Sequence, residues 1–204
     1  MSYFSARLFS WVQSAEFYRL LHQEAVALLP RGSGQSWLDA GCGPGLVTRL
    51  AAAHGYQVLG TDIDPHMIRM ARKIVQREAS TGNTRFEISG LEHLPENSAE
   101  VVSAASLLAV MDDQPAALAA LLRCARPGGT LLIVETTAQM TRAAARRLNL
   151  SGRYGAPSLA LRLWSYARAG RTVDPKIFYA TGHAVEKTVL LDGMVAAWRI
   201  TKRA

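Results

Sequence analysis

Short apolar runs alternate with amphipathic segments over the middle of the chain. The runs are bounded by glycine, proline or polar residues, as is typical of buried strands, and the segments between them have the three- to four-residue spacing of helices. The expected strands are Ser36–Ala40, Gln57–Gly60, Arg85–Ile88, Val101–Leu107 and Thr130–Glu135, and the expected helices are Leu46–Ala53, Pro65–Val75 and Gln114–Ala125, with a turn at 127–129. This alternation indicates an α/β fold with a doubly wound, mostly parallel sheet.

The remaining parts of the chain show different patterns. Residues 1–30 have helical spacing up to Pro30 and predict an N-terminal helical cap. Asp192-Gly193 lies between two apolar runs, which is a strong signal for an antiparallel C-terminal hairpin. Residues 136–182 form an insert after the fifth strand, with helical spacing at 141–148 and 158–169. We therefore expect a single domain over 1–204 that includes this cap and a helical lid over 136–182.

Charge is concentrated in the insert. The 204 residues carry a net charge of +7, with 49% hydrophobic and 19% charged residues, a composition typical of a globular protein. Between 139 and 175 the only acid is Asp174, and the arginines there are Arg142, Arg146, Arg147, Arg153, Arg162, Arg168 and Arg171. Because the rest of the chain is near neutral, DNA binding is not expected, whereas the insert could contact an anionic substrate, an anionic surface or RNA.

The cysteines and the apolar runs bear on location. Cys42 and Cys124 are far apart in sequence and form no CxxC motif, which argues against a disulfide framework or zinc site and suggests a reducing compartment. No metal site is expected. The apolar run from Val101 to Met111 is too short to span a membrane, and charged residues interrupt the first thirty positions. These features predict a cytoplasmic protein.

A glycine-rich loop and an acid mark the candidate binding site. The first strand runs into Gly41, Gly43 and Gly45, and Asp62 ends the second strand. Glycines allow a sharp turn and a close approach of ligand to main chain, and a carboxylate at the second strand's end can accept hydrogen bonds from both ribose hydroxyls. A dinucleotide site favours a small residue where this chain has Leu46. The spacing therefore favours S-adenosylmethionine over a nicotinamide cofactor.

Four ordered motifs carry a family resemblance. WLDAGCGPG (37–45), VLGTDIDPHMI (58–68), EHLP (92–95) and ARPGGTLLIVE (125–135) resemble the successive motifs of class I S-adenosylmethionine-dependent methyltransferases. The resemblance covers about residues 35–135 and the last fifteen. It implies a Rossmann-like, seven-stranded sheet whose last strand is antiparallel, in agreement with the hairpin expected at Asp192-Gly193. It also implies S-adenosylmethionine as cofactor and S-adenosylhomocysteine as product.

The resemblance assigns roles at matching positions. The glycine loop would line the methionine part of the cofactor, Asp62 would hold the ribose, Ile63 would pack on the adenine, and the ends of two further segments would complete the site. The residues implied are Asp39, Ala40, Gly41, Cys42, Gly43, Gly45, Asp62, Ile63, Gly90, Leu91, Glu92, Ala105 and Ser106. Gly90 departs from the family, because many members have an acid there that reaches the adenine amino group.

Several readings of function stay open. A methyltransferase with a small-molecule acceptor, bound between the N-terminal helices and the insert, is the leading hypothesis. A protein or RNA acceptor, a noncatalytic S-adenosylmethionine-binding module and a nicotinamide-dependent oxidoreductase are the alternatives. No catalytic residue is assigned, because attack on a sulfonium methyl can proceed by alignment and water exclusion alone. Cys42 at a helix start and Asp112-Asp113 before a helix are interpreted as a buried loop residue and an N-cap.

Overall fold

A computed structural model of the chain describes residues 11–78 and 83–203. Its centre is a seven-stranded sheet in the order β3-β2-β1-β4-β5-β7-β6, in which β7 alone runs antiparallel to its neighbours. The strands are β1 (Ser36–Ala40), β2 (Gln57–Asp62), β3 (Thr84–Ile88), β4 (Ala99–Ala105), β5 (Ala125–Thr136), β6 (Ala184–Leu190) and β7 (Val195–Thr201). The predicted sheet and its antiparallel end are confirmed.

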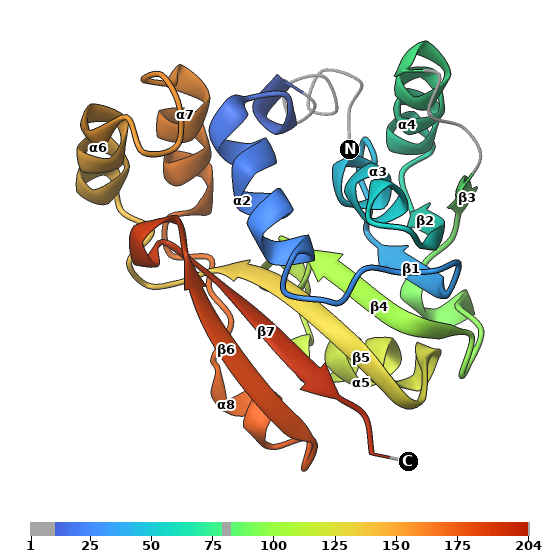
Figure 1. The fold of residues 1–204 in the computed structure, drawn as a ribbon. Coiled ribbons are helices and arrows are strands. Elements are labelled where there is room, and N and C mark those ends of the chain that lie inside the picture. The colour runs from blue at the N-terminus through green and yellow to red at the C-terminus, as the bar shows by residue number, and fades with distance from the viewer. Residues whose placement is uncertain (1–10, 79–82, 204) are drawn as a thin grey trace.

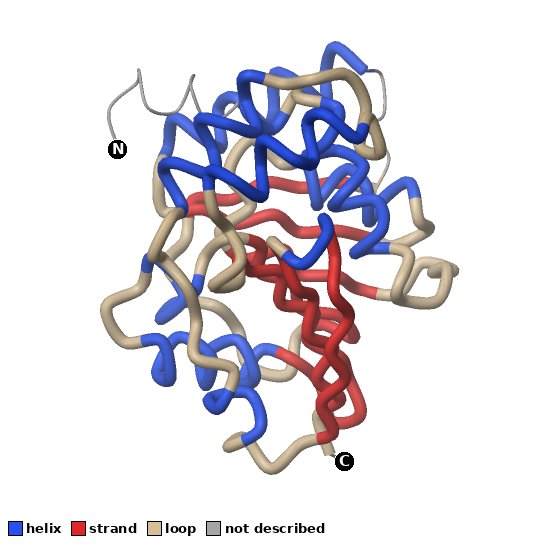
Figure 2. Tube along the Cα trace, turned by 90° about the vertical axis from the view of Figure 1, so that its left-hand side faces the viewer, coloured by secondary structure: helices blue, strands red, loops and turns tan. Residues whose placement is uncertain are grey.

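Helices cover both faces of this sheet (Figures 1 and 2). On one side lie α2 (Glu16–Val26), α3 (Leu46–Ala53), α4 (Pro65–Glu78), α6 (Arg142–Ser151) and α7 (Leu159–Arg168), and on the other lie α5 (Gln114–Cys124) and α8 (Lys176–Tyr179). Side chains alternate along β5, so Leu132 and Val134 pack in the first layer whereas Leu131 and Ile133 pack in the second. Both faces are therefore buried, as in other parallel sheets with helices on each side.

Two local predictions were wrong in extent. β4 ends at Ala105, two residues early, because Ser106 has a φ of +57° that extended backbone does not adopt. The turn expected at 127–129 lies inside β5 instead. Gly128 has a φ of +74°, and its N–H bonds the Lys202 carbonyl at 3.0 Å. A glycine irregularity thus allows one strand to continue where the sequence indicated two elements.

Capping residues explain where the helices begin. Asp113 accepts the Ala116 N–H at 2.9 Å at the start of α5, and Thr141 accepts the Ala144 N–H at 3.1 Å at the start of α6. The prediction that the acidic pair before α5 caps this helix is therefore confirmed for Asp113. The hairpin turn is η3 (Leu191–Gly193), which joins β6 to β7.

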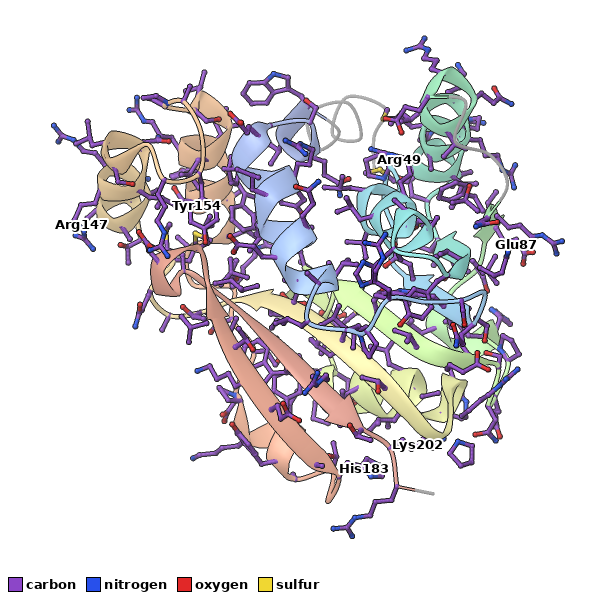
Figure 3. All side chains as sticks on the ribbon, viewed as in Figure 1. Arg49, Glu87, Arg147, Tyr154, His183 and Lys202 are labelled. Carbon is purple, nitrogen blue, oxygen red and sulfur yellow. The ribbon has the colours of Figure 1, made fainter. Side chains whose placement is uncertain are left out.

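The insert is attached to the rest of the fold by tyrosine hydrogen bonds. Tyr154, labelled in Figure 3, lies in the loop between α6 and α7. Its hydroxyl donates to Glu24 of α2 at 3.0 Å and accepts the Leu191 N–H at 3.2 Å. Trp164 of α7 packs on Phe17 and Tyr18 of α2, with ring centroids 5.8 and 5.4 Å apart. The N-terminal cap predicted over 1–30 is described only from residue 11; its earlier part lies outside the described residues.

Candidate functional site

The glycine-rich loop joins β1 to α3 at the carboxyl edge of the sheet. Gly41, Gly43 and Gly45 have φ values of +67°, +54° and +80°, the left-handed region that glycine adopts at no steric cost. A Cβ on Gly45 would meet the Phe86 ring at 2.7 Å. The Cys42 N–H donates to a carbonyl of β2 at 2.9 Å. Dihedral angle and close packing therefore both require glycine in this loop.

Asp62 ends β2 beside this loop. Its Oδ2 accepts the Gly43 N–H at 2.9 Å, and its Oδ1 accepts the Asp64 N–H at 2.8 Å. Burial raises the pKa of the Asp62 carboxyl above its ordinary value, and these two N–H donors oppose the rise. Each oxygen keeps acceptor capacity for a further donor. The backbone thus holds a carboxylate that could accept two ligand hydroxyls.

The Asp39 side chain is buried beneath the site and makes hydrogen bonds within the protein interior. Its carboxyl is buried and accepts the hydroxyls of Thr48 at 2.7 Å and Ser103 at 2.8 Å, and the Trp37 indole N–H donates to Ser103 at 2.7 Å. Burial raises the pKa of Asp39 to about 6, and the two hydroxyl donors oppose the rise. This network joins β1, β4 and α3. Any contact of Asp39 with a ligand would therefore come from its main chain.

The other predicted positions follow the same edge. Ala40 is fully buried and pairs in register with Thr61 and Ala104, so the ends of β1, β2 and β4 are adjacent. Ile63 is 74% exposed, beside Asp62. Ala105 is half-buried at the last position of β4. The structure therefore brings the loop, Asp62 and the end of β4 together.

The segment expected at the adenine edge forms a 3₁₀ turn, η1 (Leu91–His93), next to β3. The Ser89 N–H bonds the Asp62 carbonyl at 3.2 Å, which ties this segment to the ribose position. The Glu92 carboxylate lies where a Cβ on Gly90 would point, so it fills the space beside that glycine. A carboxylate therefore lies beside position 90 although residue 90 is glycine, and this carboxylate is also within 3.1 Å of the His93 ring nitrogen Nδ1.

Cys42 is a buried structural residue. Its side chain is 5% exposed, and burial, with the carboxylates of Asp39 and Asp62 adding to it, raises the pKa of the thiol well above its ordinary value. A buried thiol with a raised pKa is a poor nucleophile. Its interpretation as a small loop residue agrees with this environment.

A second group of polar residues lies at the ends of β4 and β5, and of its members only Ser106 was assigned to the site from the sequence. We call Tyr18, Ser106, Glu135 and Arg168 the edge cluster. Arg168 Nη2 donates to the Ser106 carbonyl at 3.2 Å, and the Tyr18 hydroxyl lies within hydrogen-bonding reach of Ser106. Burial raises the pKa of Tyr18 to about 12, so its hydroxyl stays protonated at neutral pH. An acid at the end of a buried apolar strand was the signal in the sequence.

Glu135 is the acid of this cluster and is 1% exposed. Its Oε1 accepts the Leu108 N–H at 2.6 Å and the Ala109 N–H at 3.4 Å, at the start of η2 (Leu108–Val110). Burial raises the pKa of Glu135 to about 7, and the Arg168 guanidinium, followed by the N–H donors, opposes the rise. This carboxyl can therefore exchange a proton near neutral pH.

Burial separates Arg168 from the other arginines of the insert, which are all exposed. Arg142 lies over the Tyr166 ring, 4.5 Å from its centroid, and Arg153 pairs with Asp192 at 2.6 Å. Arg147 points away from the molecule in Figure 3. The insert thus presents most of its charge to solvent and directs one guanidinium into the edge cluster.

Other features of the described residues lie elsewhere. A hollow of about 280 Å³ is lined by Gln23 of α2, Leu50 of α3 and His54, which directly follows α3, among others. Since α3 ends at that point, the hollow lies away from the carboxyl edge. Residues 11–78 and 83–203 contain no group of three or more His, Cys, Asp or Glu suited to a metal ion. No helix among them has the length and apolar character needed to cross a bilayer.

The comparisons agree with the motifs. Residues 38–133 match a family model described as a methyltransferase domain. The chain is 31% identical over 131 residues to a malonyl-(acyl-carrier protein) O-methyltransferase of Serratia marcescens, covering 64% of this chain and 50% of that protein. It is 29% identical over 165 residues to a trans-aconitate 2-methyltransferase of Methylobacterium radiotolerans, covering 76% of this chain and 59% of that protein. The chain spans about half the length of the curated relatives it matches.

A solved structure shows the same fold. Magnesium protoporphyrin IX methyltransferase of Synechocystis PCC 6803, with bound SAH (S-adenosylhomocysteine), superposes with a TM-score of 0.69 over 96% of this chain and 93% of that chain, at 16% identity. Identity at this level indicates the fold alone. In the present chain, this fold places the glycine-rich loop and the end of β2 at the edge where α/β sheets bind ligands.

Proposed function

We propose that this chain is a class I, Rossmann-like methyltransferase that uses S-adenosylmethionine and transfers the cofactor's methyl group to a small molecule. The methyltransferase-domain match over residues 38–133 and the shared fold support this proposal. The observation that carries the proposal is Asp62, held by two backbone N–H groups beside a loop whose three glycines have positive φ. A site for a nucleoside without phosphates needs this combination, because ribose needs an acceptor and the methionine part needs accessible main chain.

The residues present fit this cofactor. We assign the ribose hydroxyls to Asp62, the adenine to exposed Ile63 and to Gly90–Glu92, and the methionine part to Asp39–Gly45 with Ala105 and Ser106. When bound, S-adenosylmethionine supplies an electrophilic methyl group on a sulfonium. The Glu92 carboxylate beside Gly90 provides the acceptor that the adenine amino group requires. The side chain of Asp39 keeps the loop in place from below.

The acceptor would lie at the edge cluster, beneath α2 and α7. Three aromatic side chains of these helices border this position and are shielded from solvent, since each is at most 3% exposed: Phe17, Tyr18 and Trp164. A closed apolar wall excludes water and lets the site act mainly by aligning nucleophile and methyl. The lid role of residues 136–182 is part of this proposal, and the hydrogen bonds of Tyr154 to α2 and η3 support it.

Two measurements test the function. Calorimetry is expected to detect binding of S-adenosylmethionine or S-adenosylhomocysteine and no binding of NAD. Turnover against a library of small molecules, followed as S-adenosylhomocysteine release, separates an enzyme from a binding module. NAD binding without any response to S-adenosylhomocysteine refutes the cofactor assignment. Cofactor binding without turnover on any small molecule favours a macromolecular acceptor or the noncatalytic alternative.

The outer face of the insert supports a second candidate role. Leu159, Leu163 and Tyr166 are 59%, 43% and 63% exposed on α7, and exposed arginines surround them. Apolar residues next to basic ones on one amphipathic helix are typical of contact with an anionic lipid surface. Contact with RNA, which also needs positive charge, has no comparable support from the apolar residues.

Vesicles test this role separately from catalysis. The parent protein is expected to sediment with vesicles of mixed phosphatidylglycerol and phosphatidylcholine at low salt. Replacing Arg146 and Arg147 by glutamine should release it, whereas cofactor binding should stay unchanged. Arg153 is left in place because it pairs with Asp192. Retention on RNA instead, or on neither, contradicts the lipid role.

Location in the cytoplasm is the last part of the proposal. Its support is that Cys42 and Cys124 are both buried as free thiols, a state that a reducing compartment preserves. Fractionation of cells that express the protein from its own promoter, with a tag on either end, tests this assignment.

A further inference from the structure

Two buried polar atoms of the edge cluster, on different elements, have no partner. Glu135 Oε2, at the end of β5, and Arg168 Nη1, at the end of α7, are both shielded from solvent, and neither has a hydrogen-bond partner within the described part of the chain. The two side chains form no ion pair with each other among the described residues. An unpaired buried acceptor or donor costs about 1–3 kcal/mol, so such a pair indicates a site for a ligand.

The position of the pair relates it to the proposed reaction. Arg168 also donates to the carbonyl of Ser106, which directly follows β4, and Ser106 has the strained φ of +57°. The Ser106 N–H bonds the Val134 carbonyl at 2.8 Å, so Glu135 lies next to the end of β4. The proposed function assigns that end to the methionine part of the cofactor. The two unpartnered atoms therefore border the place where the methyl group would be presented.

We propose that the acceptor is a hydroxyl compound, an alcohol or a phenol, and that Glu135 and Arg168 act on its hydroxyl group. This inference rests on the proposed function. The acceptor O–H donates to Glu135 Oε2, and its oxygen accepts from Arg168 Nη1. In the reaction the proton passes to Glu135, the oxygen forms a bond to the methyl carbon, and the carbon–sulfur bond breaks with its electron pair left on sulfur. The products are a methyl ether, S-adenosylhomocysteine and a protonated Glu135.

A hydroxyl fits this pair better than other nucleophiles do. A carboxylate has no hydrogen to give to Glu135 and would bring a second negative charge next to it. A protonated amine would meet the positive charge of Arg168. A hydroxyl is neutral, and it supplies one donor and one acceptor, which are the two partners that Glu135 and Arg168 lack. Both buried groups are then satisfied at once, which is the condition for a stable buried polar network.

The surroundings of Glu135 suit a general base. The groups that face it are the backbone N–H donors of residues 107–109, the Arg168 guanidinium of α7 and the Tyr18 hydroxyl of α2. Arg168 is permanently charged, and Tyr18 stays neutral, so Glu135 is the member of the edge cluster that titrates near pH 7. A base with a pKa near the working pH is the most effective one. The Arg168 guanidinium would stabilise the charge that develops on the oxygen as the proton leaves.

The experiment uses matched acceptors. Phenol, benzoate and aniline form one set, and cyclohexanol, cyclohexanecarboxylate and cyclohexylamine form another, extended to larger skeletons in the same way. The full chain is incubated with S-adenosylmethionine bearing a deuterated methyl group, and products are identified by mass. Methyl ethers from the hydroxyl members are expected, with kcat/KM rising about tenfold per pH unit up to about pH 7 and level above it.

Variants then separate catalysis from structure. Glu135→Gln keeps an oxygen for the N–H groups of η2, so the fold should persist, while kcat/KM for the hydroxyl acceptor should fall about 10²–10⁴-fold and lose its pH dependence. Arg168→Gln should lower kcat/KM about 10²–10³-fold. Glu87→Gln, at an exposed position labelled in Figure 3, and Arg77→Gln, at an exposed position of α4, are the matched controls and should leave kcat/KM unchanged.

The outcomes are distinguishable. Methyl esters or N-methyl products, or a wild-type rate that falls as pH rises, overturn the hydroxyl inference and leave the methyltransferase proposal intact. The same holds if the cofactor binds and no hydroxyl member is methylated. Absence of cofactor binding refutes the proposed function itself. If either edge-cluster variant does not fold, product identity and the wild-type pH profile still decide the question, because neither requires a variant.

Discussion

Asp62→Ala tests the assignment on which the cofactor site depends. The wild-type carboxylate accepts one N–H from Gly43 and one from Asp64, and its remaining acceptor capacity would receive the two ribose hydroxyls. Alanine removes both kinds of contact. The Gly43 N–H then loses its partner in the loop that lines the methionine part, so the variant affects ribose recognition directly and the loop geometry indirectly.

The magnitude follows from the number of bonds lost. Hydrogen bonds to a charged group contribute about 1.5–3 kcal/mol each, and water replaces part of this when the ligand is absent. Two such bonds amount to about 2–4 kcal/mol, or roughly a 30- to 1000-fold weaker affinity. Burial of Asp62, which already raises its pKa, means that the carboxylate has little water to give up when ribose arrives. The loss should therefore lie within this range rather than below it.

Calorimetric titration with S-adenosylhomocysteine measures the effect. Asp113→Ala is the matched control, since it removes an N-cap at the start of α5 and should cost about 1 kcal/mol of stability without changing affinity. Circular dichroism and thermal unfolding establish that both variants fold. An Asp62→Ala affinity within threefold of wild type, in a folded protein, would show that another residue holds the ribose.

Three further experiments test the geometry around the site. The pKa of Asp39 is about 6 in the folded protein and 3.8 in the unfolded chain, so the free energy of unfolding falls as pH rises through that range. Asp39→Asn removes this titration. Between pH 5 and 8, thermal unfolding should show the wild type losing about 1–2 kcal/mol of stability relative to Asp39→Asn. Gly45→Ala should cost at least about 2 kcal/mol in urea unfolding because of its positive φ and the Phe86 ring, whereas Gly128→Ala, with positive φ but open space, should cost about 1 kcal/mol. Cys42 should react with a disulfide reagent at least about tenfold more slowly in native protein than in urea, when measured in a Cys124→Ser background.

Each of these three experiments has an outcome that would contradict the structural argument. Parallel pH profiles for wild type and Asp39→Asn would mean that this carboxyl is ionised in the fold at no cost. Equal losses at Gly45 and Gly128 would show that only the dihedral angle matters. A Cys42 thiol that reacts rapidly in the native state would contradict its burial.

The sequence determined the parts of the protein that depend on neighbouring residues. Strand and helix positions follow from local spacing, and the antiparallel ending follows from Asp192-Gly193, because backbone preferences act over a few residues. The glycine loop and Asp62 could be found together because each terminates a strand of a parallel sheet, and such ends meet at one edge. Errors fell at Ser106 and Gly128, where single dihedral angles decide whether a strand ends or continues.

Only the tertiary structure decided which charged residues matter. In sequence, Arg168 is one of many arginines in the insert, and Glu135 is the last letter of a strand. Their importance comes from burial, which depends on how α7 packs against α2 over the ends of β4 and β5. Likewise, the Glu92 carboxylate reaches the space beside Gly90 through the 3₁₀ turn η1. The burial of a side chain and its distance from residues far away in sequence depend on how the whole chain packs. Local sequence patterns therefore predicted the strands and helices, whereas tertiary packing determined which charged side chains lie together at the carboxyl edge of the sheet.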